Sequence, residues 1–71
     1  MDEIQKEVYI LKFGRFNQHY LNCVYSVCVM GNGNIQITDD FRTNDYQIAL
    51  TEAMRLASLY RLEIVEDEER D

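Results

Sequence analysis

The 71-residue chain has no proline and no tryptophan, and only one histidine, two cysteines and three glycines. Without proline or a Gly/Ser-rich stretch there is no sign of a linker, so we expect residues 1–71 to form a single domain. The histidine and the cysteines together are too few for the four ligands of a structural zinc site. We expect neither a metal nor a cofactor.

Basic residues are also scarce, because seven Lys and Arg stand against 13 Asp and Glu, a formal net charge of −6. A protein that binds the phosphates of nucleic acid, or an anionic membrane, needs clustered Lys and Arg. We therefore expect no direct nucleic-acid contact and no membrane contact. The acidic balance favours a protein partner with a basic surface.

Long apolar runs are missing as well, since none approaches the roughly 18 residues of a membrane span. The start, Met1-Asp2-Glu3, lacks the basic and apolar segments of a secretory signal. Cys23 and Cys28 would point to opposite faces of a strand, so we expect two buried, reduced thiols and no disulfide. These features predict a cytoplasmic protein, located in the host cytoplasm if a phage encodes it.

Strand signals fill the first half of the chain. Glu7–Phe13 is rich in β-branched and aromatic residues and predicts a strand, whereas Gly14–His19 is mostly polar and predicts a connection. Tyr20–Met30 has wholly apolar odd positions and mixed even positions. This period of two predicts a long second strand.

A hairpin signal follows at Gly31–Gly33. A two-residue turn would set the apolar side chains of one strand against polar side chains of the next. A three-residue loop instead pairs Val29 with Ile35, apolar with apolar, and is the register we expect. The third strand is then predicted over Asn34–Thr38, and Asp39-Asp40 ends it.

A helix is predicted to begin after Asn44, which forms a capping-box pattern with Gln47. Apolar residues follow at helical spacing in one broad stripe: Tyr46, Ala49, Leu50, Ala53, Leu56, Ala57 and Tyr60. Leu62–Val65 predicts a short last strand, and the charged residues 66–71 predict a frayed acidic tail.

The order of these elements is β-β-β-α-β. It predicts the α+β class, with a small, mostly antiparallel four-stranded sheet and one helix packed on one face. A right-handed crossover brings the last strand back parallel to the third and places it beside the first.

The first candidate surface lies on the second strand. No Asp, Glu, Lys or Arg occurs between Phe16 and Thr38, although a one-sided sheet normally exposes charge on its wet face. A homodimer is the simplest cover for such a face; the alternative is that neutral polar residues suffice. The candidate self-association residues are Tyr20, Asn22, Val24, Ser26, Cys28 and Met30.

The second candidate surface is acidic. If the end of the third strand and the tail lie near each other, their fields sum into a patch that can engage a basic nucleic-acid-binding groove. The alternative is a solvated surface that keeps a small protein in solution. The candidate partner-binding residues are Asp39, Asp40, Asp45, Glu63, Glu66, Asp67, Glu68 and Glu69.

No catalytic pattern accompanies these surfaces. His19 has no partner visible in the sequence, and Gly31–Gly33 is turn chemistry rather than a phosphate-binding loop. Neither Cys23 nor Cys28 has a basic neighbour that would lower the pKa of its thiol. We therefore expect that the protein is not an enzyme.

In size, acidity and lack of motifs, the chain resembles the small inhibitors that phages and other mobile elements encode, such as anti-CRISPR and uracil-glycosylase inhibitor proteins. The resemblance is one of composition and transfers no residue roles. It implies a non-enzymatic, anti-defence module that inhibits a nucleic-acid-handling protein. A homo-oligomeric adaptor is the alternative, and a small-ligand sensor with His19, Tyr20 and Tyr25 around a pocket is the third.

Overall fold

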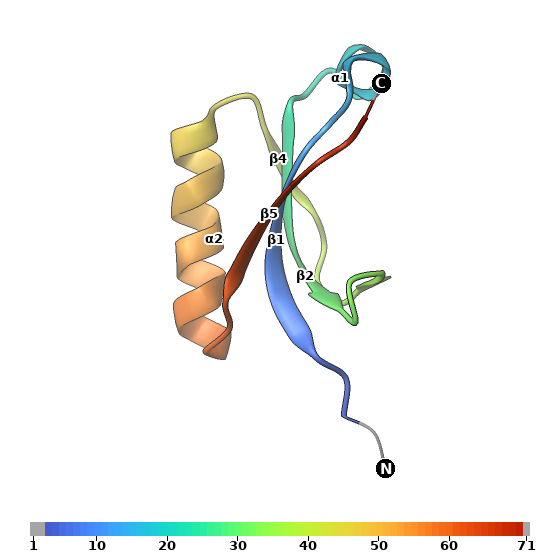
Figure 1. The fold of residues 1–71 in the computed structure, drawn as a ribbon. Helices are drawn as coiled ribbons and strands as arrows, with labels where there is room; N and C mark the ends of the chain where they lie inside the picture. Colours follow the sequence, from blue (N-terminus) through green and yellow to red (C-terminus); the bar gives the residue numbers. More distant parts are fainter. Residues whose placement is uncertain (1–2, 71) are drawn as a thin grey trace.

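Figure 1 shows the computed structural model, which describes residues 3–70, as one twisted sheet with a long helix on one face. The expected α+β class and the one-sided helix are confirmed. The elements in chain order are β1 (Lys6–Lys12), α1 (Arg15–Leu21), β2 (Tyr25–Gly31), β3 (Ile35–Gln36), β4 (Phe41–Thr43), α2 (Tyr46–Tyr60) and β5 (Ile64–Glu68).

The antiparallel pair β1 and β2 forms the centre of the sheet. Strand β5 lies parallel to β1, so the order is β3-β2-β1-β5, and the expected place of the last strand beside the first is confirmed. The sheet has five strands because the predicted third strand, Asn34–Thr38, is shortened to β3 and is followed by a strand that was not predicted, β4. At the break, Val29 N donates to the Thr38 side-chain hydroxyl at 2.9 Å, and β4 then resumes pairing with β2.

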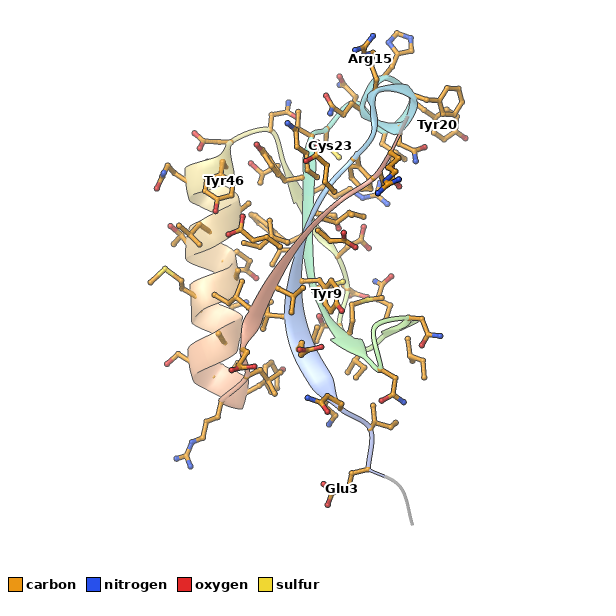
Figure 2. The ribbon with its side chains drawn as sticks, in the orientation of Figure 1. Glu3, Tyr9, Arg15, Tyr20, Cys23 and Tyr46 are labelled. Atoms are coloured by element: carbon orange, nitrogen blue, oxygen red, sulfur yellow. The ribbon has the colours of Figure 1, made fainter. Side chains whose placement is uncertain are left out.

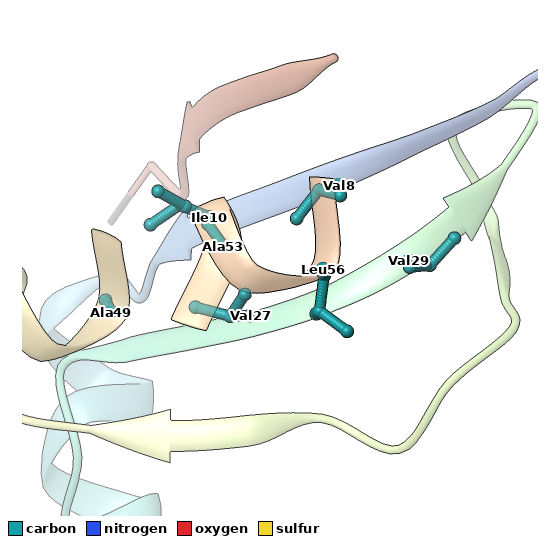
Figure 3. Close-up of a cluster of buried hydrophobic side chains, with 7 residues drawn as sticks. All are labelled: Val8, Ile10, Val27, Val29, Ala49, Ala53 and Leu56. Carbon is teal, nitrogen blue, oxygen red and sulfur yellow. The ribbon is translucent and has the colours of Figure 1, made fainter. Parts of the chain in front are cut away.

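The hydrophobic core lies between α2 and the two central strands (Figure 3). Small alanines on the helix allow its backbone to approach the sheet closely, and branched side chains on the strands fill the space. Tyr60, expected in this stripe, is instead 51% exposed at the end of the helix. The core residues are Val8, Ile10, Val27, Val29, Ala49, Ala53 and Leu56.

The predicted hairpin register is wrong by two residues. The backbone N–H of Ile37, not that of Ile35, donates to Val29 O at 2.9 Å. Asn32 and Gly33 both have positive φ, at 53° and 77°, which places the turn centre there. Asn34 is then the extra residue that restores apolar-to-apolar pairing.

The predicted second strand is too long, because Tyr20 belongs to the short helix α1 and not to β2. Asn22, in the left-handed region at φ 56°, ends this helix. The polar segment Gly14–His19 is therefore mostly helical rather than an irregular connection. No residue of α1 is buried, so no apolar stripe in the sequence marked it.

Two further expectations, about where α2 begins and where β5 ends, are corrected. The N-cap of α2 is Asp45, whose carboxylate accepts from Gln47 N at 2.8 Å, while the Asn44 side chain accepts from Val24 N. The predicted frayed tail is ordered through Glu68 in β5, and Glu69 N still bonds to Lys12 O. Only residue 71 of that tail lies outside the described residues.

Candidate partner-binding edge

Strand β5 forms one edge of the sheet. Its neighbour on one side is β1, and no strand among residues 3–70 pairs with its other side. An edge strand presents main-chain N–H and C=O groups that a further extended segment can pair with. β5 is therefore a candidate partner-binding edge.

The side chains of β5 put carboxylates on both faces of the sheet. Glu66 pairs with Ile10 of the core, so Glu66 and Glu68 face the same side as α2, and Asp67 faces the opposite side. No Lys or Arg occurs from Leu62 to Glu69. The edge is therefore strongly negative whichever face a partner approaches.

On the α2 side, β5 borders an open cleft of about 690 Å³, which we call the tyrosine cleft. The rings of Tyr25 and Tyr46 meet there edge to face, with centroids 5.6 Å apart and planes at 61°. The Tyr46 hydroxyl donates to Glu66 Oε1 at 2.8 Å. The cleft is lined by Ile10, Lys12, Tyr25, Tyr46, Glu66, Asp67, Glu68, Glu69 and Arg70.

The carboxylate of Glu66 also changes the acidity of Tyr46. A hydrogen bond from the phenol to a carboxylate favours the neutral phenol, and this raises the pKa of Tyr46 above its ordinary value. The hydroxyl therefore stays a donor to Glu66 over the physiological range. Figure 2 shows Tyr46 at the first turn of α2, on the side of the sheet opposite to Tyr9.

On the face opposite α2, a smaller cleft of about 320 Å³ lies over β1 and β2, and we call it the sheet cleft. Its floor holds the small side chains Ser26 and Cys28, both buried although no helix covers them. Tyr9 stands opposite Cys28 on β1, and Arg42 stands opposite Ser26 on β4. Larger neighbours on both sides thus wall off the small residues and make this face concave.

One charged pair stands at the wall of the sheet cleft. Arg42 Nε donates to Asp40 Oδ2 at 2.7 Å, and this hydrogen bond holds the pKa of Asp40 below its usual range. Burial, with Asp40 nearby, raises the pKa of the Cys28 thiol. Cys28 therefore carries little thiolate at neutral pH and is poorly suited to nucleophilic chemistry.

The predicted acidic surface is divided by the fold. Asp39 and Asp40 lie at the β3–β4 edge, across the sheet from β5, although Asp40 and Asp67 line the same sheet cleft. Asp45 caps α2, and Glu63 is exposed just before β5 with its carbonyl bound to Val8 N. The carboxylates that remain exposed on β5 are Glu66, Asp67 and Glu68.

Glu69 has a structural role instead. Its Oε2 accepts from Gly14 N at 2.9 Å, and both carboxylate oxygens accept from the Asn17 side-chain amide. These bonds fasten α1 to the end of β5, where Figure 1 shows the two side by side.

The predicted self-association surface is only partly assembled. Ser26, Cys28 and Met30 line the sheet cleft together, whereas Tyr20 lies on α1 and Asn22 ends it. Val24 is half-buried just before β2. The predicted residues before Tyr25 do not lie on this face of the sheet, because β2 begins only at Tyr25.

The predicted ligand pocket around His19, Tyr20 and Tyr25 is not assembled either. His19 and Tyr20 are exposed on α1, whereas Tyr25 lines the tyrosine cleft on β2. Tyr20 stacks on Phe16 with centroids 6.2 Å apart, and both rings are about three-quarters exposed, at 75% and 76%. Neither ring lines the tyrosine cleft or the sheet cleft.

Tyr46 is the site residue that sequence reasoning missed, since its place in the apolar stripe assigned it to the core, and Tyr25 was expected beside His19 and Tyr20 rather than beside Tyr46. A tyrosine hydroxyl near a core normally finds a polar partner, and an acidic residue in the last strand was the available signal.

No protein-family model, no curated protein and no solved structure matches the chain. Among residues 3–70, no helix has the length and apolar character needed to cross a membrane. In the same part of the chain, no three Cys, His, Asp or Glu side chains gather closely enough to hold a metal ion.

Proposed function

We propose that the protein is a non-enzymatic binding module that docks its β5 edge on the basic, nucleic-acid-binding surface of another protein and inhibits it. The observation that carries this proposal is the combination of an unpaired sheet edge with the three exposed carboxylates Glu66, Asp67 and Glu68. Main-chain groups of the edge supply affinity for an extended segment, and the carboxylates select a basic one.

The charge of the edge also indicates what does not bind there. A second copy of the chain would bring Glu66, Asp67 and Glu68 against the same three carboxylates, and this repulsion opposes pairing of two β5 strands. The same negative field attracts a basic partner, whichever face of the sheet it approaches. Electrostatic steering would also speed its association at low ionic strength.

The test is capture of the partner from the native host by tagged protein, followed by competition with nucleic acid. We expect D67K/E68K to weaken capture at least about tenfold, because both side chains are exposed on β5. The matched control is E3K/D39K, which changes net charge equally at exposed sites away from β5. We expect this control to behave as wild type, and an excess oligonucleotide to release the captured partner.

Retention of the same captured proteins by D67K/E68K, at unchanged affinity, would overturn the proposed function. So would a captured partner whose binding is insensitive to nucleic acid.

A further inference from the structure

We propose that the tyrosine cleft receives an arginine side chain of the partner, held against Tyr25 and Tyr46 and beside Glu66. The proposal rests on the proposed function, because it names the group that a basic partner would insert next to β5. It assigns a specific task to a cleft that the fold itself leaves open on the α2 side.

The two aromatic rings supply the first part of the site. With planes at 61° and centroids 5.6 Å apart, Tyr25 and Tyr46 form a corner rather than a flat stack. The face of an aromatic ring attracts cations. A planar guanidinium stacks on such a face better than an ammonium does, which favours arginine over lysine.

The carboxylates supply the second part. Glu66 accepts the Tyr46 hydroxyl through Oε1, and a carboxylate has lone pairs on both oxygens for further donors. Glu68 lies on the same face of β5 and lines the same cleft. A guanidinium with several N–H donors can bind Glu66 while its plane rests on a ring.

Ile10 closes the base of the cleft but is only 2% exposed, so it offers no surface to a ligand. The aliphatic stem of an arginine would instead lie along the tyrosine rings while its charged end remains near water. Ring faces and a carboxylate thus stand next to each other, as an arginine side chain needs.

Lys12 and Arg70 line the cleft too and carry the opposite sign. They make the sign of the ligand testable. If a cation enters, removing the Lys12 charge should strengthen binding and removing the Glu66 charge should weaken it. If an anion enters, both effects reverse.

The experiment is an NMR titration of the whole chain with the blocked peptide Gly-Gly-Arg-Gly-Gly, and with its citrulline analogue as a neutral, nearly isosteric control. We expect the arginine peptide to shift the ring signals of Tyr25 and Tyr46 and the citrulline peptide to leave them almost unchanged. E66Q, which retains an acceptor for Tyr46, should weaken binding about two- to fivefold. K12A should strengthen it by a similar factor.

Equal shifts by both peptides, shifts confined to other surfaces, or unchanged affinity in E66Q would each overturn the assignment. A reversed order, with weaker binding in K12A, would overturn it as well. These results are separable from the partner test, because D67K/E68K can lose the captured partner while the peptide fails to bind the tyrosine cleft. In that case β5 remains the docking edge and arginine insertion alone is wrong.

Discussion

Asp40 shows how one exposed ion pair affects stability through pH. The Arg42 hydrogen bond holds the pKa of Asp40 below its usual range, and Gln36 Nε2 donates to the same carboxylate at 3.2 Å. The folded protein therefore binds this proton less tightly than the unfolded chain does. The resulting stability is fully present above the ordinary aspartate pKa of about 3.9 and is lost as pH falls through the lower, folded value.

At the residue scale we predict that the Asp40 carboxyl titrates below an ordinary aspartate, and that R42M moves its pKa up towards the ordinary value. Loss of the charged donor removes the largest cause of the shift. The measurement is a carboxyl-carbon NMR titration. R55M is the matched control, since Arg55 pairs with Glu52 and should change the titration of Glu52 alone. An Asp40 that titrates normally in wild type would contradict the prediction.

Single residues also show where a sequence pattern cannot distinguish between two neighbouring positions. Asn44 and Asp45 are both good N-cap residues in adjacent positions, and the capping box with Gln47 favoured the first. In the structure Asp45 is the N-cap, because the Asn44 side chain instead accepts a hydrogen bond from Val24 N, twenty residues away in the sequence. A local sequence pattern cannot include a hydrogen bond between residues that the pairing of β2 with β4 brings together.

The helix α1 depends on one carboxylate from the far end of the chain. An isolated helix shorter than about 12 residues is marginal in water, and α1 has seven residues with none buried. Glu69 bonds to Gly14 N and to the Asn17 side chain across sequence separations of 55 and 52 residues. Gln18 adds a side-chain bond to Phe13 O at 2.7 Å.

At the element scale we predict that E69A loosens α1 without unfolding the sheet. Amide hydrogen exchange in residues 15–21 should accelerate, because their local opening costs less free energy. Exchange in β1 and β2 should be unchanged, and the free energy of unfolding should fall by no more than about 1 kcal/mol. E63A is the control, since the Glu63 side chain is exposed and only its carbonyl bonds to β1. Equal exchange of α1 in E69A and wild type would show that Glu69 does not hold this helix.

The elements that could be predicted are those whose stabilising contacts leave a periodic pattern in the local sequence. β1 and α2 were predicted because their apolar residues repeat at the periods of a strand and a helix. α1 was not predicted because its contacts lie at the other end of the chain. The hairpin itself was predicted, but its register was not. Alternating apolar residues give the same apolar pairing when the register shifts by two residues, and the loop includes Asn34 where Gly31 was expected.

The whole molecule combines a predictable charge with an unpredictable site. The acidic run of the last strand can be read directly from the sequence. The tyrosine cleft cannot, because Tyr25 on β2 and Tyr46 on α2 meet only when the helix packs across the sheet beside β5. The same parallel pairing of β5 with β1 brings Glu66 under the Tyr46 hydroxyl.

The net charge of −6 should make the fold more stable at higher salt. Repulsion among like charges destabilises a compact state, and the Debye length falls from about 30 Å at 10 mM salt to about 10 Å at 100 mM. Two ion pairs oppose this repulsion, Arg42–Asp40 and Arg55–Glu52, and as surface pairs they contribute little.

We therefore predict that the midpoint temperature rises by about 2–4 °C between these salt concentrations, which corresponds to about 0.5 kcal/mol in a domain of this size. D67K/E68K should flatten this rise most, because Asp67 and Glu68 stand in a run of four consecutive acidic residues. E3K/D39K, of equal net charge, should flatten it less. Thermal unfolding followed by circular dichroism measures all three proteins. A midpoint that falls with salt in wild type would mean that ion pairs outweigh the repulsion along β5, and the acidic edge would then be neutralised more fully than its sequence indicates.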